Sequence, residues 1–185
     1  MNFYLIGFIV FVVLIAFWAI SVYNGLIGLK NKVEEAFSTM DVYLKKRYDL
    51  IPNLVETVKG YAKHEKETLE AVIQARNTAV SSVGPEAKIA NENALTGTLS
   101  KLFALAEAYP DLKANTNFID LQTQLKSLED EIANARKYYN GTVRQFNTSI
   151  QVFPTNLLAA PLGFKKQPLF EVESDTERQN VKVSF

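Results

Sequence analysis

The sequence has no cysteine, one histidine and one tryptophan, and its 20 basic and 20 acidic side chains cancel. Without cysteine, the chain forms no disulfide bond and offers no thiolate as a nucleophile or metal ligand. Zero net charge leaves no basic excess for nucleic-acid binding, so we expect no nucleic-acid partner. The same balance leaves no polybasic patch for anionic lipids, because only the KKR run at 45–47 is locally basic.

The residues needed for familiar catalytic sites are also scarce. His64 and Glu65 begin HEKET, which lacks the second histidine of the HExxH zinc motif, so we expect His64 on a helix surface or in a turn. The chain has no GxSxG elbow, and its eight glycines are scattered singly, so it has no phosphate-binding loop. We therefore expect a protein that is not an enzyme and that uses no metal and no cofactor.

Formal charge is absent from the start of the chain, where no ionisable side chain except tyrosine precedes Lys30. Residues 3–20 form an apolar run, FYLIGFIVFVVLIAFWAI, long enough to cross a hydrocarbon core as a helix. Tyr4 and Tyr23 would stand about 28 Å apart, close to the spacing of the two aromatic belts. A cleaved signal peptide would need a charged start and a small-residue cleavage site, and a buried core helix would need a polar face. We therefore predict an uncleaved membrane-spanning helix.

The positive-inside rule sets the expected orientation. Lys30, Lys32 and the basic run 45–47 follow the apolar run, which favours a short N-terminus outside and the remaining chain in the cytoplasm. We predict a transmembrane anchor at 1–25, a helical domain at 26–152 and an extended C-terminal tail at 153–185. The residues that follow the anchor, about 160 in number, have the size of one domain.

Apolar residues at three- and four-residue steps predict four amphipathic helices after the anchor. The first covers 24–49. The break follows at 49–52, where Pro52 should turn or kink the chain and open the second helix. Gly84 ends the second helix and Pro85 opens the third. The third helix has a predicted inner face of Ala87, Ala90, Ala94, Leu95, Leu99, Leu102, Phe103 and Ala106.

The fourth helix, over 118–150, is the most periodic, and Asn115, Thr116 or Asn117 is expected to cap its start. Four such helices predict an all-α fold, an antiparallel four-helix bundle behind a single transmembrane helix, because each apolar stripe needs partners. A long rod-like coiled coil is the alternative. In the tail, Phe153, Phe164, Phe170 and Phe185 are expected to pack on the bundle, and residues 180–185 are read as a short strand or as disordered.

Polar residues gather around the predicted break at Pro52, namely Asp41, Arg47, Asp49 and Asn53. One interpretation is that they cap and cross-connect two helix ends. The alternative is a polar edge on which a partner docks. Arg76 and Arg136 lie on or beside the apolar stripes of the second and fourth helices. Each is expected to pair with a carboxylate, for which Glu35 or Glu129 is a candidate.

Several strings resemble the LemA family of bacterial membrane proteins. They include VEEAFSTMDVYLKKRYDLIPNLVETVKGYAKHE at 33–65, YPDLKAN at 109–115 and IANARKYYNGTV at 132–143. The resemblance covers nearly the whole chain in the same order. It implies a short N-terminus, one transmembrane helix and a four-helix bundle at the bacterial inner membrane, and it implies no reaction.

Two functions follow as hypotheses. The first is a non-enzymatic, single-pass scaffold or adaptor for other membrane proteins, with self-association through the anchor or the bundle. The second is a membrane-tethered sensor that binds a lipid or a small ligand where the alanine-rich start of the third helix packs weakly.

Overall fold

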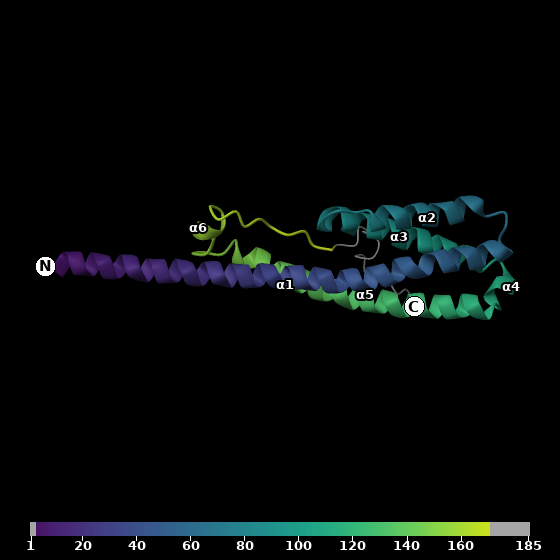
Figure 1. Ribbon diagram of the computed structural model, residues 1–185, viewed down its shortest axis with the longest axis horizontal. Coiled ribbons are helices and arrows are strands. Elements are labelled where there is room, and N and C mark those ends of the chain that lie inside the picture. The colour runs from purple at the N-terminus through teal and green to yellow at the C-terminus, as the bar shows by residue number, and fades with distance from the viewer. Residues whose placement is uncertain (1–2, 171–185) are drawn as a thin grey trace, which may run out of the picture. The chain divides into compact units, whose positions relative to one another are not determined.

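The computed structural model describes residues 3–170, and all regular structure within them is helical (Figure 1). The predicted all-α class is therefore confirmed for this part of the chain. Phe185 and the alternating residues 180–185 lie outside the described residues. The helices are α1 (Phe3–Tyr61), α2 (Lys66–Val80), α3 (Pro85–Ala106), α4 (Pro110–Lys113), α5 (Thr116–Ser149) and α6 (Asn156–Ala159).

The described residues divide into two compact units, which share the long helices α1 and α5. The membrane-proximal unit, so named for the apolar run it contains, comprises residues 3–40 and 134–169. The polar-core unit comprises residues 41–133 and Phe170. Each unit has its own buried residues and is described separately below.

Helix α1 begins with the apolar run. It contains an 18-residue window of mean hydropathy 2.9, none of which is buried, so the helix is long and apolar enough to cross a membrane. The helix continues without interruption through residues 22–28, as the absence of proline after the run predicts. Gly25 and Gly28 lie within it, where their missing side chains leave open space. The apolar run and the first buried residue, Leu26, therefore belong to one helix.

The predicted helix boundary at Pro52 is wrong, because α1 runs through this proline and ends at Tyr61. Proline removes the N–H that would bond the carbonyl four residues earlier, which here belongs to Tyr48. Arg76 of α2 replaces that donor, since its Nε donates to the Tyr48 carbonyl at 2.9 Å. The break between the first two helices therefore lies at residues 62–65, which connect α1 to α2, and not at Pro52.

In the polar-core unit, segments of α1, α2, α3 and α5 all contribute fully buried side chains. Helices α2 and α3 lie side by side (Figure 1). The rings of Phe103 and Phe118 join α3 to α5, with centroids 6.4 Å apart. The residues least exposed to solvent include Leu44, Ile51, Leu54, Val58, Val72, Ala79, Leu95, Leu102, Leu112, Leu125 and Ile132.

The inner face predicted for the third helix is wrong over its first half. Ala87, Ala90 and Ala94 are exposed, whereas Ile89 and Glu92 are buried. Alanine buries little apolar area, so its pattern carries a weak signal about which face turns inward. From Leu95 onward the predicted leucines are buried as expected.

The helix boundaries after α2 follow their local signals. Gly84 has a φ of 83°, a conformation that glycine adopts readily, and Pro85 opens α3 as predicted. Asn115 caps α5, because its side-chain oxygen accepts a bond from the Phe118 N–H at 3.0 Å. The side-chain amide of Asn115 also donates to the Tyr61 hydroxyl at 2.9 Å and so joins the end of α1 to the start of α5.

In the membrane-proximal unit, α1 and α5 share a core with the segment that follows α5. The rings of Phe37 and Tyr139 lie 5.7 Å apart, and the Tyr139 hydroxyl donates to the Pro168 carbonyl at 2.9 Å. Phe164 packs against Tyr23 of α1 and Phe146 of α5 at 6.1 and 6.3 Å. This ring therefore anchors the tail as expected.

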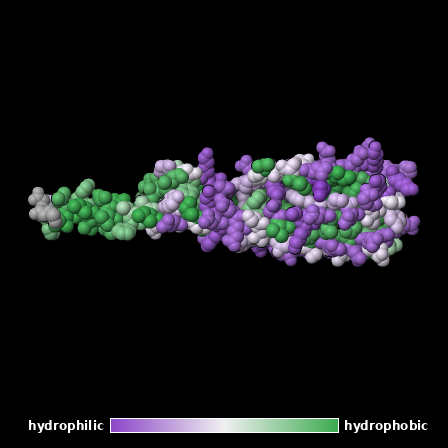
Figure 2. Space-filling model, in the orientation of Figure 1, coloured by the Kyte–Doolittle hydropathy of each residue, from purple (hydrophilic) through white to green (hydrophobic). Residues whose placement is uncertain are grey.

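Other tail phenylalanines behave differently. Phe170 is buried as expected, but Phe153 is 78% exposed, so its predicted packing on the helices is wrong. Four consecutive residues of the segment form the short helix α6 rather than extended chain. Figure 2 shows apolar side chains gathered over this part of the unit, beside the apolar start of α1.

Candidate functional site

A buried ionic cluster occupies the polar-core unit, centred on Arg47 of α1, whose side chain is wholly buried. Its Nη2 donates to Glu92 Oε2 of α3. Its Nη1 donates to Glu129 Oε1 of α5 at 2.6 Å and to Thr96 Oγ1 at 3.2 Å. One guanidinium therefore connects three helices.

Glu92 is the matching buried anion. Its second carboxylate oxygen accepts a hydrogen bond from the Tyr48 hydroxyl, so Arg47 and Tyr48 hold the group from two sides. Burial, and then the bond to this carboxylate, raise the pKa of Tyr48 above its ordinary value of 10.0. The tyrosine therefore stays a neutral donor at physiological pH.

The four residues of the predicted polar cluster lie within α1 and not at helix ends. Arg47 is buried, and Asp41 accepts a hydrogen bond from Lys88 of α3. Asp49 and Asn53 are exposed, and the backbone carbonyl of Asn53 accepts the Thr57 hydroxyl at 2.8 Å. The structure therefore places Asp41 and Arg47 in contacts with α3, and Asp49 and Asn53 toward solvent.

Sequence reasoning missed Glu92, because an isolated glutamate in a helix is usually solvated. A signal was present, since Glu92 stands three residues after Ile89 and three before Leu95, on the buried stripe. The partner expected for Arg76 was also wrong. Arg76 bonds the Tyr48 carbonyl and the Asn77 side chain, and Glu129 pairs with Arg47 instead.

A groove of about 730 Å³ lies between α3 and α5 in the same unit. Leu99, Phe103 and Leu125 provide apolar walls, and Thr96 and Glu129, two partners of Arg47, line the same groove. The groove therefore combines apolar walls with polar groups, the mixture of surfaces that small-molecule sites usually present.

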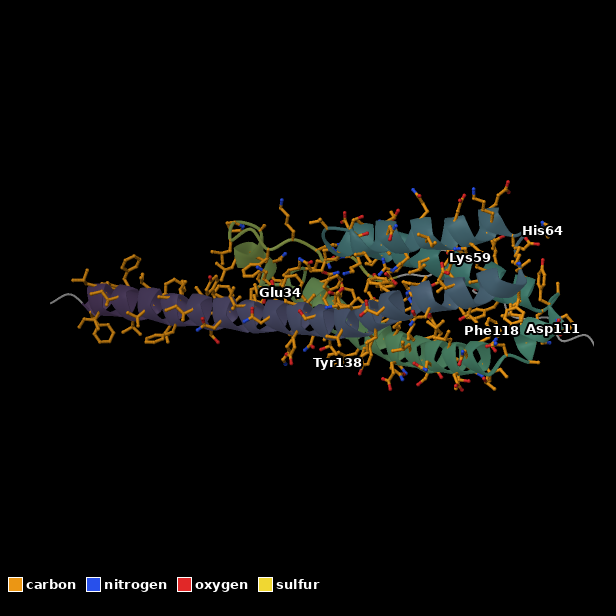
Figure 3. The ribbon with its side chains drawn as sticks, turned by 45° about the vertical axis from the view of Figure 1, so that its right-hand side comes forward. Glu34, Lys59, His64, Asp111, Phe118 and Tyr138 are labelled. Atoms are coloured by element: carbon orange, nitrogen blue, oxygen red, sulfur yellow. The ribbon has the colours of Figure 1, made fainter. Side chains whose placement is uncertain are left out.

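His64 lies in the exposed connection between α1 and α2, as expected for a turn residue (Figure 3). Among residues 3–170, no group of three His, Asp or Glu side chains converges as a metal site would require.

These features define a class of protein, a helical protein whose described residues include an N-terminal helix apolar enough to cross a membrane and a buried ionic cluster. The family model for the LemA family matches residues 36–185. The chain therefore belongs to the LemA family.

The chain is also similar to individual proteins, one of which carries the family's name. The chain is similar to the protein LemA of Metamycoplasma hominis, with 28% identity over 98% of this chain and 83% of the relative. It is also similar to the magnetosome proteins MamQ 2 of Paramagnetospirillum magneticum (23% identical) and MamQ of Magnetospirillum gryphiswaldense (22% identical). Those two matches cover 80% of this chain but only 64% of each magnetosome protein, less than two thirds of its length.

Proposed function

We propose that the protein is a non-enzymatic scaffold or adaptor for other membrane proteins, anchored in the bacterial inner membrane by residues 3–20. The observation that carries this proposal is the continuity of α1, whose 59 residues include both the exposed apolar run and core residues such as Leu44 and Ile51. A continuous helix, unlike a flexible linker, leaves no unstructured break between the apolar run and the residues that follow it. The sequence supports the non-enzymatic part, because it has no recognisable catalytic motif.

The domain that α1 enters is proposed to be an antiparallel four-helix bundle. Two contacts support opposite directions for α1 and α5, since Arg47 meets Glu129 whereas the later Tyr61 meets the earlier Asn115. A short bismaleimide should cross-link Asp41→Cys to Lys88→Cys, whose parent side chains are bonded, in this cysteine-free chain. The control pair of Asp41→Cys with Lys101→Cys, further along α3, should stay unlinked.

The scaffold proposal is tested by photo-crosslinking in intact cells. A photoreactive residue at Val42, an exposed position on α1, is used in the tagged full-length protein, which is then purified in mild detergent. We expect specific membrane proteins, or further copies of this chain, in covalent adducts. The control carries Val12→Arg and Val13→Arg in the apolar run and should lose these adducts. Recovery of the monomer alone would refute the scaffold role.

The proposed orientation places the helical domain in the cytoplasm, following Lys30, Lys32 and the basic run 45–47. Val83→Cys provides a single exposed thiol in the turn between α2 and α3. A membrane-impermeant maleimide should label it only after cell lysis. Equal labelling in intact cells would reverse the orientation.

The groove between α3 and α5 favours a second candidate function, a sensor that binds a lipid or a small ligand. Ser100 is exposed and lines the groove, so Ser100→Trp should fill it without disturbing the core. Ala104→Trp, one helical turn further on α3, is the matched control. Added phospholipid should raise the thermal midpoint of the wild type and of Ala104→Trp but not of Ser100→Trp. An unchanged wild-type midpoint, with no ligand retained in native mass spectrometry, would exclude this function.

A further inference from the structure

The membrane-proximal unit carries an apolar surface that its own core leaves uncovered. This surface, here called the loop patch, lies after α5 and includes α6. Its large side chains are all substantially exposed, and the most exposed are Phe153 at 78% and Leu157 at 61%. The members are Val152, Phe153, Leu157 and Leu162. Apolar side chains gathered on one surface mark a site of interaction.

The position of the loop patch along α1 identifies its partner. Phe164, two residues after Leu162, packs on Tyr23 with ring centroids 6.1 Å apart. Tyr23 follows the apolar run by less than one helical turn, at the level where tyrosine and tryptophan rings meet lipid headgroups. The loop patch therefore lies beside the end of the run, within the same compact unit.

Basic side chains beside the loop patch also favour a position at the level of the lipid headgroups. Lys165 and Lys166 are exposed and follow Phe164 directly. Lys165 and Lys30 line one hollow of about 430 Å³, and Lys30 also pairs with Glu34 at 3.6 Å. Lysine side chains beside an apolar surface keep their ammonium groups at the level of the lipid phosphates while their methylene chains lie deeper.

We propose that the loop patch inserts into the interfacial layer of a phospholipid bilayer and forms a second membrane contact beside α1. The short helix α6 then lies in the zone between headgroups and acyl chains, and Lys30, Lys165 and Lys166 face the phosphates. This inference rests on the proposed insertion of residues 3–20. Two contacts at one level would restrict the tilt and rotation of α1, which a single helix leaves free.

Tryptophan fluorescence in proteoliposomes tests this proposal. The only native tryptophan is removed by Trp18→Phe, and one reporter is introduced in the full-length protein, either Phe153→Trp or Leu157→Trp. The vesicles contain phosphatidylcholine brominated near the upper end of its acyl chains. Both reporters should lose severalfold more emission than the control Tyr138→Trp. Circular dichroism confirms that each variant retains its helices.

Tyr138 is a matched control because it is an exposed aromatic residue in the same unit, on the outer side of α5 (Figure 3). Its neighbour Tyr139 contacts Phe37, which lies about 21 Å further along α1 than Tyr23. A second reporter, Phe11→Trp, lies in the middle of the apolar run and reports insertion of the run itself through lipids brominated deeper in the chains.

The outcomes separate the two proposals. Quenching at Phe11→Trp without excess quenching at the loop reporters overturns the loop contact and leaves the anchor intact. An absence of quenching at Phe11→Trp overturns the anchor and the loop contact together. A third outcome is that the loop reporters are not quenched but their emission shifts to the blue as the protein concentration rises. That result would show that the loop patch contacts a second copy of the chain, and it would overturn the lipid contact.

Discussion

At the scale of single residues, the ionic cluster around Arg47 links three helices through one buried side chain. Burying a guanidinium costs several kcal/mol unless anions and acceptors surround it. Glu92, Glu129 and Thr96 provide those acceptors, and they come from two other helices. The cluster therefore forms only when α1, α3 and α5 are in register, and it selects one arrangement of these helices.

Removal of the cation tests this view. Arg47→Met should lower the free energy of unfolding by about 3–5 kcal/mol, because Glu92 would stay buried without its partner. The combined change Arg47→Met with Glu92→Leu should recover much of that loss. Urea denaturation of the detergent-solubilised full-length protein, followed by circular dichroism, measures both. The control Arg144→Met on an exposed part of α5 should change stability by less than about 0.5 kcal/mol. A small effect at Arg47 would contradict the cluster's role.

Tyr139 gives a pH-dependent prediction. Burial raises its pKa from 10.0 to about 12 in the folded protein. Between these values the folded chain holds a proton that the unfolded chain releases, so stability falls as pH rises, by about 1.4 kcal/mol per pH unit. Tyr139→Phe removes this dependence and, at neutral pH, costs about 1 kcal/mol for the lost bond to the Pro168 carbonyl.

The stability advantage of the wild type over Tyr139→Phe should therefore shrink above pH 10.0 and reverse about one pH unit higher, because a loss of about 1.4 kcal/mol per pH unit soon exceeds about 1 kcal/mol. Chemical denaturation at several alkaline pH values measures it. Because lysines also titrate in this range, only the difference between the two proteins is informative. A difference that stays constant with pH would show that the tyrosine has no raised pKa.

At the scale of elements, α1 shows how a helix accommodates a proline. The Tyr48 carbonyl loses its intrahelical donor at Pro52 and receives one from Arg76 of α2. The contact from the neighbouring helix thus compensates for the break in the hydrogen-bond ladder. Reasoning from one helix at a time does not include this contact between helices. It therefore places the end of the first helix at Pro52 instead of at Tyr61.

A double-mutant cycle tests the compensation. Pro52→Ala should raise stability by about 1–2 kcal/mol, because the gain in helix propensity exceeds the loss of proline's rigidity in the unfolded chain. Arg76→Met should cost about 1.5–3 kcal/mol with Pro52 present, since the Tyr48 carbonyl then lacks a donor. In the Pro52→Ala background the same change should cost less, because the alanine N–H bonds that carbonyl. Equal costs in the two backgrounds would show that the residues are not coupled.

At the scale of the whole molecule, charge is distributed unevenly along the chain. Every Lys, Arg, Asp and Glu lies at or after Lys30, and the exposed apolar run of α1 precedes them. In water such an exposed run would be costly, whereas in a bilayer its helix satisfies every backbone group internally. This uneven distribution of charge supports the proposed anchoring by residues 3–20.

Charge inserted into the run should weaken the anchor. Val12→Arg with Val13→Arg should each oppose insertion by about 2.5–3.5 kcal/mol. A large part of the protein should then appear in the supernatant after carbonate extraction of membranes. The control Val80→Arg with Val83→Arg changes two exposed valines outside the run and should leave the protein in the pellet. Full retention of the first variant would argue against a spanning helix.

Much of the fold follows from the sequence because the deciding forces are local. The apolar run, the start of α3 at Pro85 and the cap at Asn115 are read from a few adjacent residues. The inner face at the start of α3 could not be read in this way, because alanines give little hydrophobic signal there. The same limit applies to the candidate site, where Arg47 was recognised and its buried partner Glu92 was not.

The sequence by itself determined that this is a helical member of the LemA family with an apolar start long enough to span a membrane. Apolar periodicity, hydropathy and the motifs shared with the family can all be read from the sequence alone. Only the tertiary structure decided that α1 passes Pro52, that Glu92 is buried with Arg47, and that Phe153 stays exposed beside the apolar run. Each of these features depends on residues that are distant in the sequence. The free energy of burying a side chain depends on which of those residues the fold places next to it.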